Sequence, residues 1–160
     1  MKHHFIGVDP GLVHTGVVGF VFDEAAHRLR IWNVVVDGID IPEIRRMTLE
    51  VSVPVAHVFI EAYRPRSHFN TDARMVTGVS ELAKAVPNSK VINNNGAKQI
   101  VKSGIMHTME VWKFTQATNH QDLRSAARIG LYGALKDKTL NRVIYDYLTD
   151  ALDGRPWSRI

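Results

Sequence analysis

The chain has 160 residues without a cysteine, which excludes a disulfide framework and any thiolate metal site. Its net charge of +4 permits a polyanionic partner without demanding one, and its 45% of apolar residues is ordinary for a globular protein. This length favours a single domain over residues 1–160, and the lack of a signal-peptide start or a long apolar run favours a cytoplasmic protein with no membrane partner.

The first third of the chain predicts three strands joined by short links. A Pro-Gly turn, a polar link and a final Asp-Gly pair separate these apolar runs, which indicates an antiparallel meander. A helix should follow from Pro42, because proline fits the first turn of a helix and apolar residues then recur at helical spacing as far as Val53. The end of that helix could also be read as extended chain. The three strands are expected at residues 5–9, 16–22 and 29–36.

Strands and helices alternate in the rest of the chain, although residues 105–118 show no clear period. The whole order, β-β-β-α-β-α-β-α-α, predicts an α/β fold with a mixed five-stranded sheet, three antiparallel strands then parallel ones, flanked by helices. The later elements are expected at residues 57–60 (strand), 75–86 (helix), 90–92 (strand), 97–103 (helix), about 120–135 (helix) and about 140–152 (helix).

Two acidic residues directly follow apolar strands. Asp9 ends the first strand and Glu61 ends the fourth, so a parallel pairing of these strands would place the two carboxyl groups side by side, with the strands about 4.8 Å apart. Asp122, in the first turn of a later helix, could supply a third carboxylate. Clustered carboxylates repel unless a cation or a proton joins them, and an all-oxygen site suits Mg²⁺ or Mn²⁺.

Each acid also has an ordinary alternative. Asp9 could cap the turn of a β-hairpin, Glu61 could be a surface residue or the partner of an arginine, and Asp122 could simply favour the start of its helix. The ordered set of all three argues for a metal-dependent nuclease, in which paired ions activate water and stabilise the leaving oxygen of a phosphodiester.

Three segments of the chain resemble the motifs of the RuvC family of Holliday-junction resolvases, which have a ribonuclease H-like fold. The likeness extends from about Phe5 to Leu135, and the short length and divergent middle are similar to the phage-borne branch. The segments are GVDPGLVHTG (7–16), FIEAY (59–63) and HQDLRSAARIGLYG (120–133).

The resemblance implies a ribonuclease H-like nuclease domain with Asp9, Glu61 and Asp122 as catalytic metal ligands. It further implies a Mg²⁺- or Mn²⁺-dependent endodeoxyribonuclease with two ions per site, acting as a homodimer in DNA recombination and repair. Its expected substrates are four-way junctions, with other branched DNA as further candidates. The location it implies is the cytoplasm of a bacterium or of a phage-infected host.

The fourth metal ligand of the family is an Asp or His three residues before the last aspartate, and here the sequence departs from the family. Asn119 occupies that position and could be a weak neutral ligand or the cap of the helix. His120 could substitute as ligand or as acid–base group if the helix starts late. The departure leaves both alternatives open.

Basic and aromatic residues near the acids are candidate DNA contacts. Lys98 and Lys102, in a segment resembling the basic segment of the family, would share a helix face and contact phosphates, unless that face is merely solvated. Tyr63 and Phe69 are candidates for an aromatic wedge that stacks on unpaired bases, unless they are buried. Three arginines around them complete the set: Arg64, Arg66 and Arg74.

Other functions remain open at this stage. A ribonuclease H-like nuclease acting on RNA–DNA hybrids or flaps is the enzymatic alternative, and a junction-binding protein without catalytic activity is the other. The first motif also resembles the phosphate loop of sugar-kinase and actin-like ATPases, but those need a duplicated second domain that 160 residues cannot supply.

Overall fold

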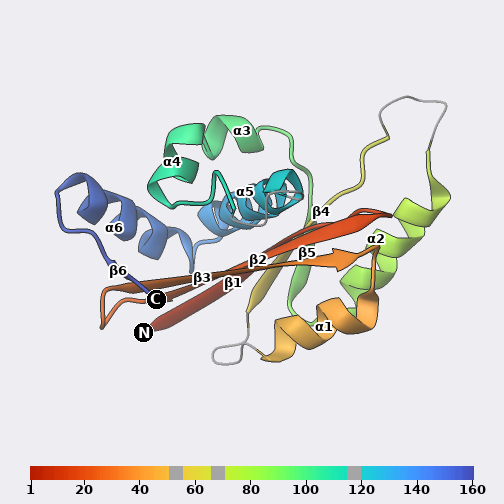
Figure 1. The fold of residues 1–160 in the computed structure, drawn as a ribbon, viewed down its shortest axis with the longest axis horizontal. Coiled ribbons are helices and arrows are strands. Elements are labelled where there is room, and N and C mark those ends of the chain that lie inside the picture. Colours follow the sequence, from red (N-terminus) through yellow and green to blue (C-terminus); the bar gives the residue numbers. More distant parts are fainter. Residues whose placement is uncertain (51–55, 66–70, 115–119) are drawn as a thin grey trace.

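A computed structural model describes residues 1–50, 56–65, 71–114 and 120–160. Its strands form one mixed sheet in the order β5-β4-β1-β2-β3-β6 (Figure 1). β1 pairs antiparallel with β2 and β2 with β3, whereas β1–β4, β4–β5 and β3–β6 are parallel pairs. The strands are β1 (Lys2–Asp9), β2 (His14–Asp23), β3 (Arg28–Asp37), β4 (His57–Glu61), β5 (Ser89–Ile92) and β6 (Ser158–Arg159).

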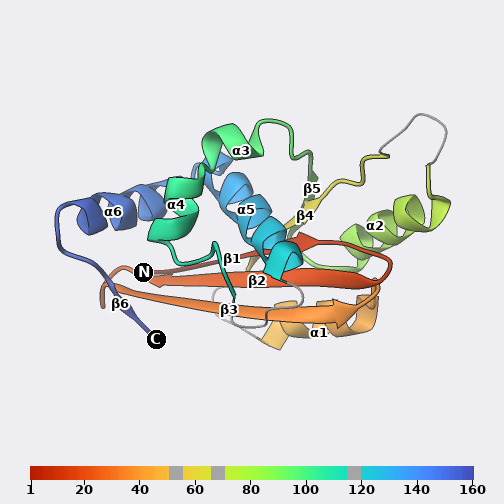
Figure 2. The same ribbon diagram turned by 45° about the horizontal axis from the view of Figure 1, so that its top comes forward.

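Helices cover both faces of the sheet (Figure 2). One face carries α1 and α2, and the other carries α3 to α6, with α5 lying across the central strands. The helices are α1 (Ile41–Glu50), α2 (Ala73–Ala85), α3 (Ala97–Ile100), α4 (Ser103–Thr108), α5 (His120–Lys136) and α6 (Asn141–Leu152). No helix in these described ranges is long and apolar enough to cross a membrane.

The central strand β1 is buried on both sides, which explains its continuous apolar run. Phe5 points into the core beneath α5 and α6, whereas Ile6 and Val8 point into the core beneath α1 and α2. Side chains alternate between faces along a strand, so Asp9 shares the α5 face with Phe5 and Gly7. The register of β1 therefore decides on which side the first acid lies.

The sequence-based prediction of the fold class is confirmed, with three differences in detail. The structure has a sixth strand, β6, at the edge beside β3. The helix expected at 97–103 is two helices, since Val101 and Lys102 between α3 and α4 have non-helical backbone (ψ 77° and 160°). Residues 103–108, mostly in the stretch without a clear period, form α4. Residues 51–53 of the first expected helix lie outside the described residues.

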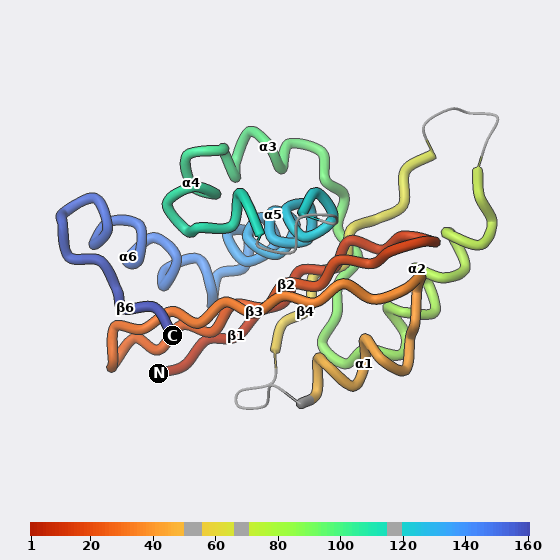
Figure 3. Tube along the Cα trace, viewed as in Figure 1, coloured from red at the N-terminus to blue at the C-terminus, as the bar shows by residue number. Residues whose placement is uncertain are grey.

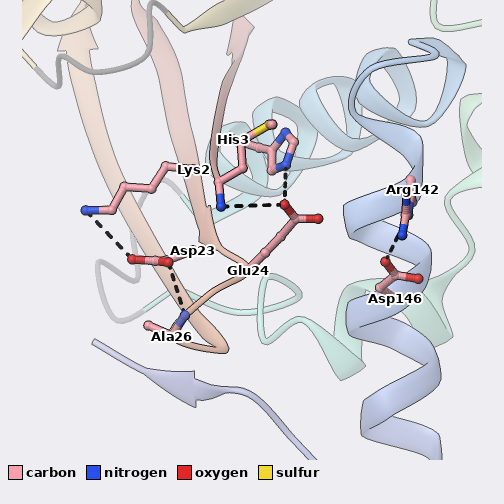
Figure 4. A network of polar contacts seen from close by, with 8 residues as sticks. Lys2, His3, Asp23, Glu24, Ala26, Arg142 and Asp146 are labelled. Carbon is pink, nitrogen blue, oxygen red and sulfur yellow. Dashed lines mark hydrogen bonds and ion pairs between the residues drawn. The ribbon is translucent and has the colours of Figure 1, made fainter.

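The two ends of the sheet differ. Both termini lie at the end where β2 turns into β3, next to β6 (Figure 3). Ion pairs join β1 to the β2–β3 turn there, with Lys2 Nζ 3.7 Å from Asp23 and His3 Nε2 3.0 Å from Glu24 (Figure 4). The opposite end of the sheet, where β1 and β4 terminate, carries the predicted acids.

Candidate active site

The three predicted acids line one open cavity of about 670 Å³. β1 and β4 run parallel and their last paired residues are Val8 and Ile60, so Asp9 and Glu61 follow on adjacent strand ends. Asp122 reaches the same cavity from the first turn of α5. The parallel pairing inferred from the sequence is confirmed.

Close packing of α5 on the sheet brings the third acid to the first two. Gly16 lies opposite Asp9 in the β1–β2 register, and a Cβ atom at Gly16 would lie 2.5 Å from the backbone oxygen of Asp122. Only glycine therefore lets the start of α5 approach this closely. Further along, a Cβ at Gly7 would lie 2.7 Å from the backbone nitrogen of Gly130, so the rest of the helix is also in backbone contact with β1.

The turn after β1 is held by a buried threonine. The Thr15 hydroxyl donates a hydrogen bond to the Gly38 carbonyl at 2.6 Å and accepts one from the Gly11 amide at 3.2 Å. The Gly38 amide in turn donates to the Val13 carbonyl at 2.8 Å. These bonds fix the Pro-Gly turn against the end of β3, which holds Asp9 at the cavity wall.

The site concentrates negative charge away from water. Burial, the neighbouring Glu61 carboxyl with its hydrogen bond to Asp9, and the charge of Asp122 together raise the pKa of Asp9 from 3.8 to about 8. Glu61 has a second partner, because the Asn94 side-chain amide donates a hydrogen bond to Glu61 Oε1. In the absence of a cation, the Asp9 carboxyl thus keeps its proton at neutral pH.

The donor chemistry suits a hard divalent cation. Carboxylate oxygens are the ligands that Mg²⁺ and Mn²⁺ prefer, and the raised pKa of Asp9 marks uncompensated negative charge that a cation would relieve. Within the described ranges, however, no three His, Asp or Glu side chains are grouped tightly enough to hold an ion as they stand.

The candidates for a fourth ligand cannot be compared directly. His120 is the first residue of α5 and is half-buried, two residues before Asp122. Asn119 lies outside the described residues. Another imidazole, His14, lines the acidic cavity itself, with its Nδ1 3.7 Å from Asp37 Oδ1.

The predicted DNA-contact residues after β4 have different surroundings. Arg64 lines the acidic cavity. Tyr63 also lines it, but its ring packs against the core beneath α1 and α2 and its hydroxyl accepts a hydrogen bond from the Asp72 amide at 3.1 Å. Arg74 is exposed and paired with Asp72 at 3.0 Å. Arg66 and Phe69 lie outside the described residues.

The two predicted lysine contacts do not share a helix face. Lys98 lies in α3 and Lys102 immediately precedes α4, on the far side of the break between the two helices, so the expected alignment was wrong. Lys98 lines a second cavity, of about 380 Å³, that shares Glu61 and Asn94 with the acidic one.

Three further residues at these cavities were not found from the sequence: Asn94, His14 and Arg128. Asn94 stands in a run of three asparagines that indicates only a loop, and His14 and Arg128 lie in motifs in which the acids are the predicted ligands. Their contacts depend on how β2, β5 and α5 meet, which no local pattern encodes.

Comparison with solved structures shows the same fold in RuvC. Thermus thermophilus RuvC in complex with a Holliday junction substrate matches with 16% identity and a TM-score of 0.50, over 97% of this chain and 98% of that one. A second structure of Thermus thermophilus RuvC matches with 17% identity and a TM-score of 0.50, over 96% and 98%.

A viral protein is also similar. The fowlpox virus resolvase, in complex with Holliday junction DNA, has 15% identity and a TM-score of 0.45, over 84% of this chain and 99% of that one. No protein-family model and no curated protein sequence matches this chain. From the sheet order, the helices on both faces and the full-length match to RuvC, the chain has the ribonuclease H-like fold of RuvC.

Proposed function

We propose that this chain is a metal-dependent endonuclease that hydrolyses phosphodiester bonds in branched DNA and resolves four-way (Holliday) junctions. The observation that carries the proposal is the convergence of Asp9, Glu61 and Asp122 on one open cavity, where burial and the acidic neighbours raise the pKa of Asp9 to about 8. An uncompensated acidic cluster beside basic side chains suits a site that recruits a divalent cation and an anionic substrate together.

The three acids would hold one or two Mg²⁺ or Mn²⁺ ions. Bound there, a divalent cation supplies charge neutralisation at a phosphate and lowers the pKa of a water molecule. Asn94 would orient the Glu61 carboxyl through their hydrogen bond, and Arg64 would offset phosphate charge from across the cavity. Whether His120 or Asn119 completes a second metal site stays a prediction.

Branched DNA is the proposed substrate on two grounds. The motifs of the chain resemble the RuvC family, and the RuvC structure that matches the whole chain was solved on a Holliday junction. The acidic cavity is also open and adjoins a cavity with basic residues, as a DNA strand lying across the site requires. We infer a single nuclease domain over residues 1–160.

A homodimer would match the two-fold symmetry of the junction and supply two active sites for paired incisions. The candidate dimer surface is a largely apolar groove of about 490 Å³ between α2 and the edge strand β5. Val76 and Val91 in this groove are 49% and 43% exposed. Exposing apolar side chains to water costs free energy, which a partner covering the groove would remove. In the RuvC family, which the motifs of this chain resemble, the helix that follows the strand ending in the motif glutamate (Glu61 here) supplies dimer contacts, and α2 holds that place in this chain.

A cleavage assay with matched variants tests the nuclease proposal. The protein is incubated with Mg²⁺ or Mn²⁺ and an immobile four-way junction, a replication fork, a 5′ flap, an RNA–DNA hybrid or linear duplex. We expect symmetric nicks in the junction, lost by at least about 100-fold in Glu61→Gln, because a missing metal ligand removes several kcal/mol of stabilisation. Glu24→Gln, at the opposite end of the sheet, is the control and should cut normally.

Each alternative function gives a different result. Equal cutting of forks, flaps or hybrids would indicate a broader ribonuclease H-like nuclease. Tight binding of the junction by the wild-type protein, without cutting under either ion, would contradict the proposal and leave a junction-binding protein.

A further inference from the structure

The second cavity adjoins the acidic one but has the opposite character. Glu61 and Asn94 form the wall common to both cavities. The other polar side chains around it come from the loop before α3 and from two helices: Asn95 from the loop, Lys98 and Gln99 from α3, and Ser125 and Arg128 from α5. A space bounded by two cations and neutral hydrogen-bonding groups therefore opens directly beside the acidic cluster.

Arg128 is the unusual member of this wall. Its Nε atom is buried without a hydrogen-bond partner, and within the described part of the chain no carboxylate forms an ion pair with its guanidinium. Burial and the charge of Arg124 lower the pKa of the Arg128 guanidinium. Arg128 is half-buried, and a partly desolvated cation without a counter-charge favours a nearby anion.

The neighbouring arginine has a structural role that Arg128 does not share. Arg124 Nε donates to the Trp112 carbonyl at 2.7 Å, and its guanidinium lies 4.1 Å from the centre of the Trp112 ring. The Arg128 guanidinium is 5.9 Å from that ring, near the outer limit of such a contact. Arg124 thus anchors the loop before α5, and Arg128 remains available to the cavity.

We propose that this cavity binds the phosphate that flanks the scissile one on the same DNA strand, with Arg128 and Lys98 as its cations. This rests on the proposed function, because a strand with its scissile phosphate at Asp9 and Glu61 must place the next phosphate close by. The planar guanidinium fork fits phosphate oxygens, and Lys98 adds a point charge from the facing helix. Arg128 is a substrate-positioning residue in this assignment.

Binding measurements without a divalent cation test the proposal independently of cleavage. Junctions are made in which one phosphate at a time near the crossover is replaced by an uncharged methylphosphonate. For the wild-type protein, we expect one such position to weaken binding by roughly tenfold, the loss of one charge-assisted contact. Arg128→Gln should bind the unmodified junction roughly tenfold more weakly than the wild-type protein. In this variant the methylphosphonate at that same position should weaken binding no further.

Two variants serve as controls. Arg142→Gln removes an exposed cation of α6 that pairs only with Asp146 at 3.6 Å, and it should keep both the affinity and the methylphosphonate effect (Figure 4). Arg128→Lys keeps the charge without the fork and should restore part of the affinity. Thermal melting establishes that each variant folds. If Arg128→Gln does not fold, the same binding measurements are made with Lys98→Gln.

The outcomes separate this proposal from the proposed function. If Arg128→Gln and every methylphosphonate act additively, or if only free inorganic phosphate binds, the flanking-phosphate site is overturned. If the wild-type protein cuts junctions but shows no coupling, the nuclease assignment survives and the subsite does not. If the coupling is present but the wild-type protein does not cut DNA, the subsite survives and the nuclease assignment fails.

Discussion

Asp9 lies where ionisation costs free energy, because its carboxyl group is largely buried and two further acids are close. The folded protein keeps the Asp9 proton up to about pH 8, whereas the unfolded chain releases it near pH 4. Without a metal ion, the free energy of unfolding should therefore fall as the pH rises between those values. The ionised Asp9 carboxylate is the form that binds a cation, and it is also the form that destabilises the metal-free protein.

Asp9→Asn should stabilise the metal-free protein while abolishing cleavage. The neutral amide removes the charge that burial and Glu61 disfavour, so we expect a gain of about 2 kcal/mol at pH 8, or about 5 °C in melting temperature. At pH 5 the gain should be smaller, because the wild-type carboxyl is then protonated. Thermal melts in EDTA at both pH values measure the difference.

Adding Mg²⁺ extends the same experiment. The ion should raise the melting temperature of the wild-type protein, because a ligand that binds only the folded state stabilises that state. It should have little effect on Asp9→Asn, which lacks one of the carboxylate ligands. Asp146→Asn, an exposed acid of α6, is the control and should change the melting temperature by little at either pH. A less stable Asp9→Asn protein at pH 8 would contradict the electrostatic account.

At the scale of elements, the site depends on how closely α5 lies on the sheet. A methyl group at Gly16 would overlap the backbone of Asp122, which cannot move without shifting the first turn of the helix. We expect Gly16→Ala to cost about 2 kcal/mol in the free energy of unfolding and to lower the cleavage rate by about 100-fold, since Asp122 would be displaced from the other acids.

Gly104→Ala is the matched control for this substitution. It lies in α4, and no atom lies within 4 Å of the added methyl group, so the change should be neutral or slightly stabilising. Urea unfolding and junction cleavage of both variants give the comparison. If Gly16→Ala unfolds normally and cuts normally, the close approach of α5 is not what positions Asp122.

The sequence allowed the strand-end acids to be predicted because their signals are local. An apolar run that ends in an acid defines Asp9 and Glu61, and helix periodicity defines the face of α5. The two-residue strand β6 carries no such signal, since it depends on the Trp157 ring stacking on His27 and on the Ser158 amide donating to the His27 carbonyl.

The missed features share a physical cause. The break between α3 and α4 lies at Val101, a fully buried residue with a non-helical backbone, so packing of its side chain in the core outweighs local helix propensity. Asn94 and Arg128 acquire their roles only where β5 and α5 come together at the cavities. Tertiary contacts between distant segments, and not residue type, decide all three.

At the scale of the molecule, the end of the sheet that carries the termini is tied by ion pairs, and the other end carries both the acidic and the basic cavity. The apolar groove between α2 and β5 lies next to this second end, since Tyr63 and Ala62 line both the groove and the acidic cavity. A partner copy in the groove would therefore lie near the proposed DNA path.

Val76→Glu should convert the proposed dimer into a monomer, because it places a charge in a groove that a second copy would have to dehydrate. Sedimentation equilibrium measures the mass, and a junction with both cut sites labelled measures whether the two incisions remain coupled. Tyr145→Glu, at a 56% exposed aromatic residue of α6, is the control and should stay dimeric. A wild-type protein that remains monomeric even on the junction would contradict the dimer, whereas single uncoupled nicks by Val76→Glu would tie paired incision to this groove.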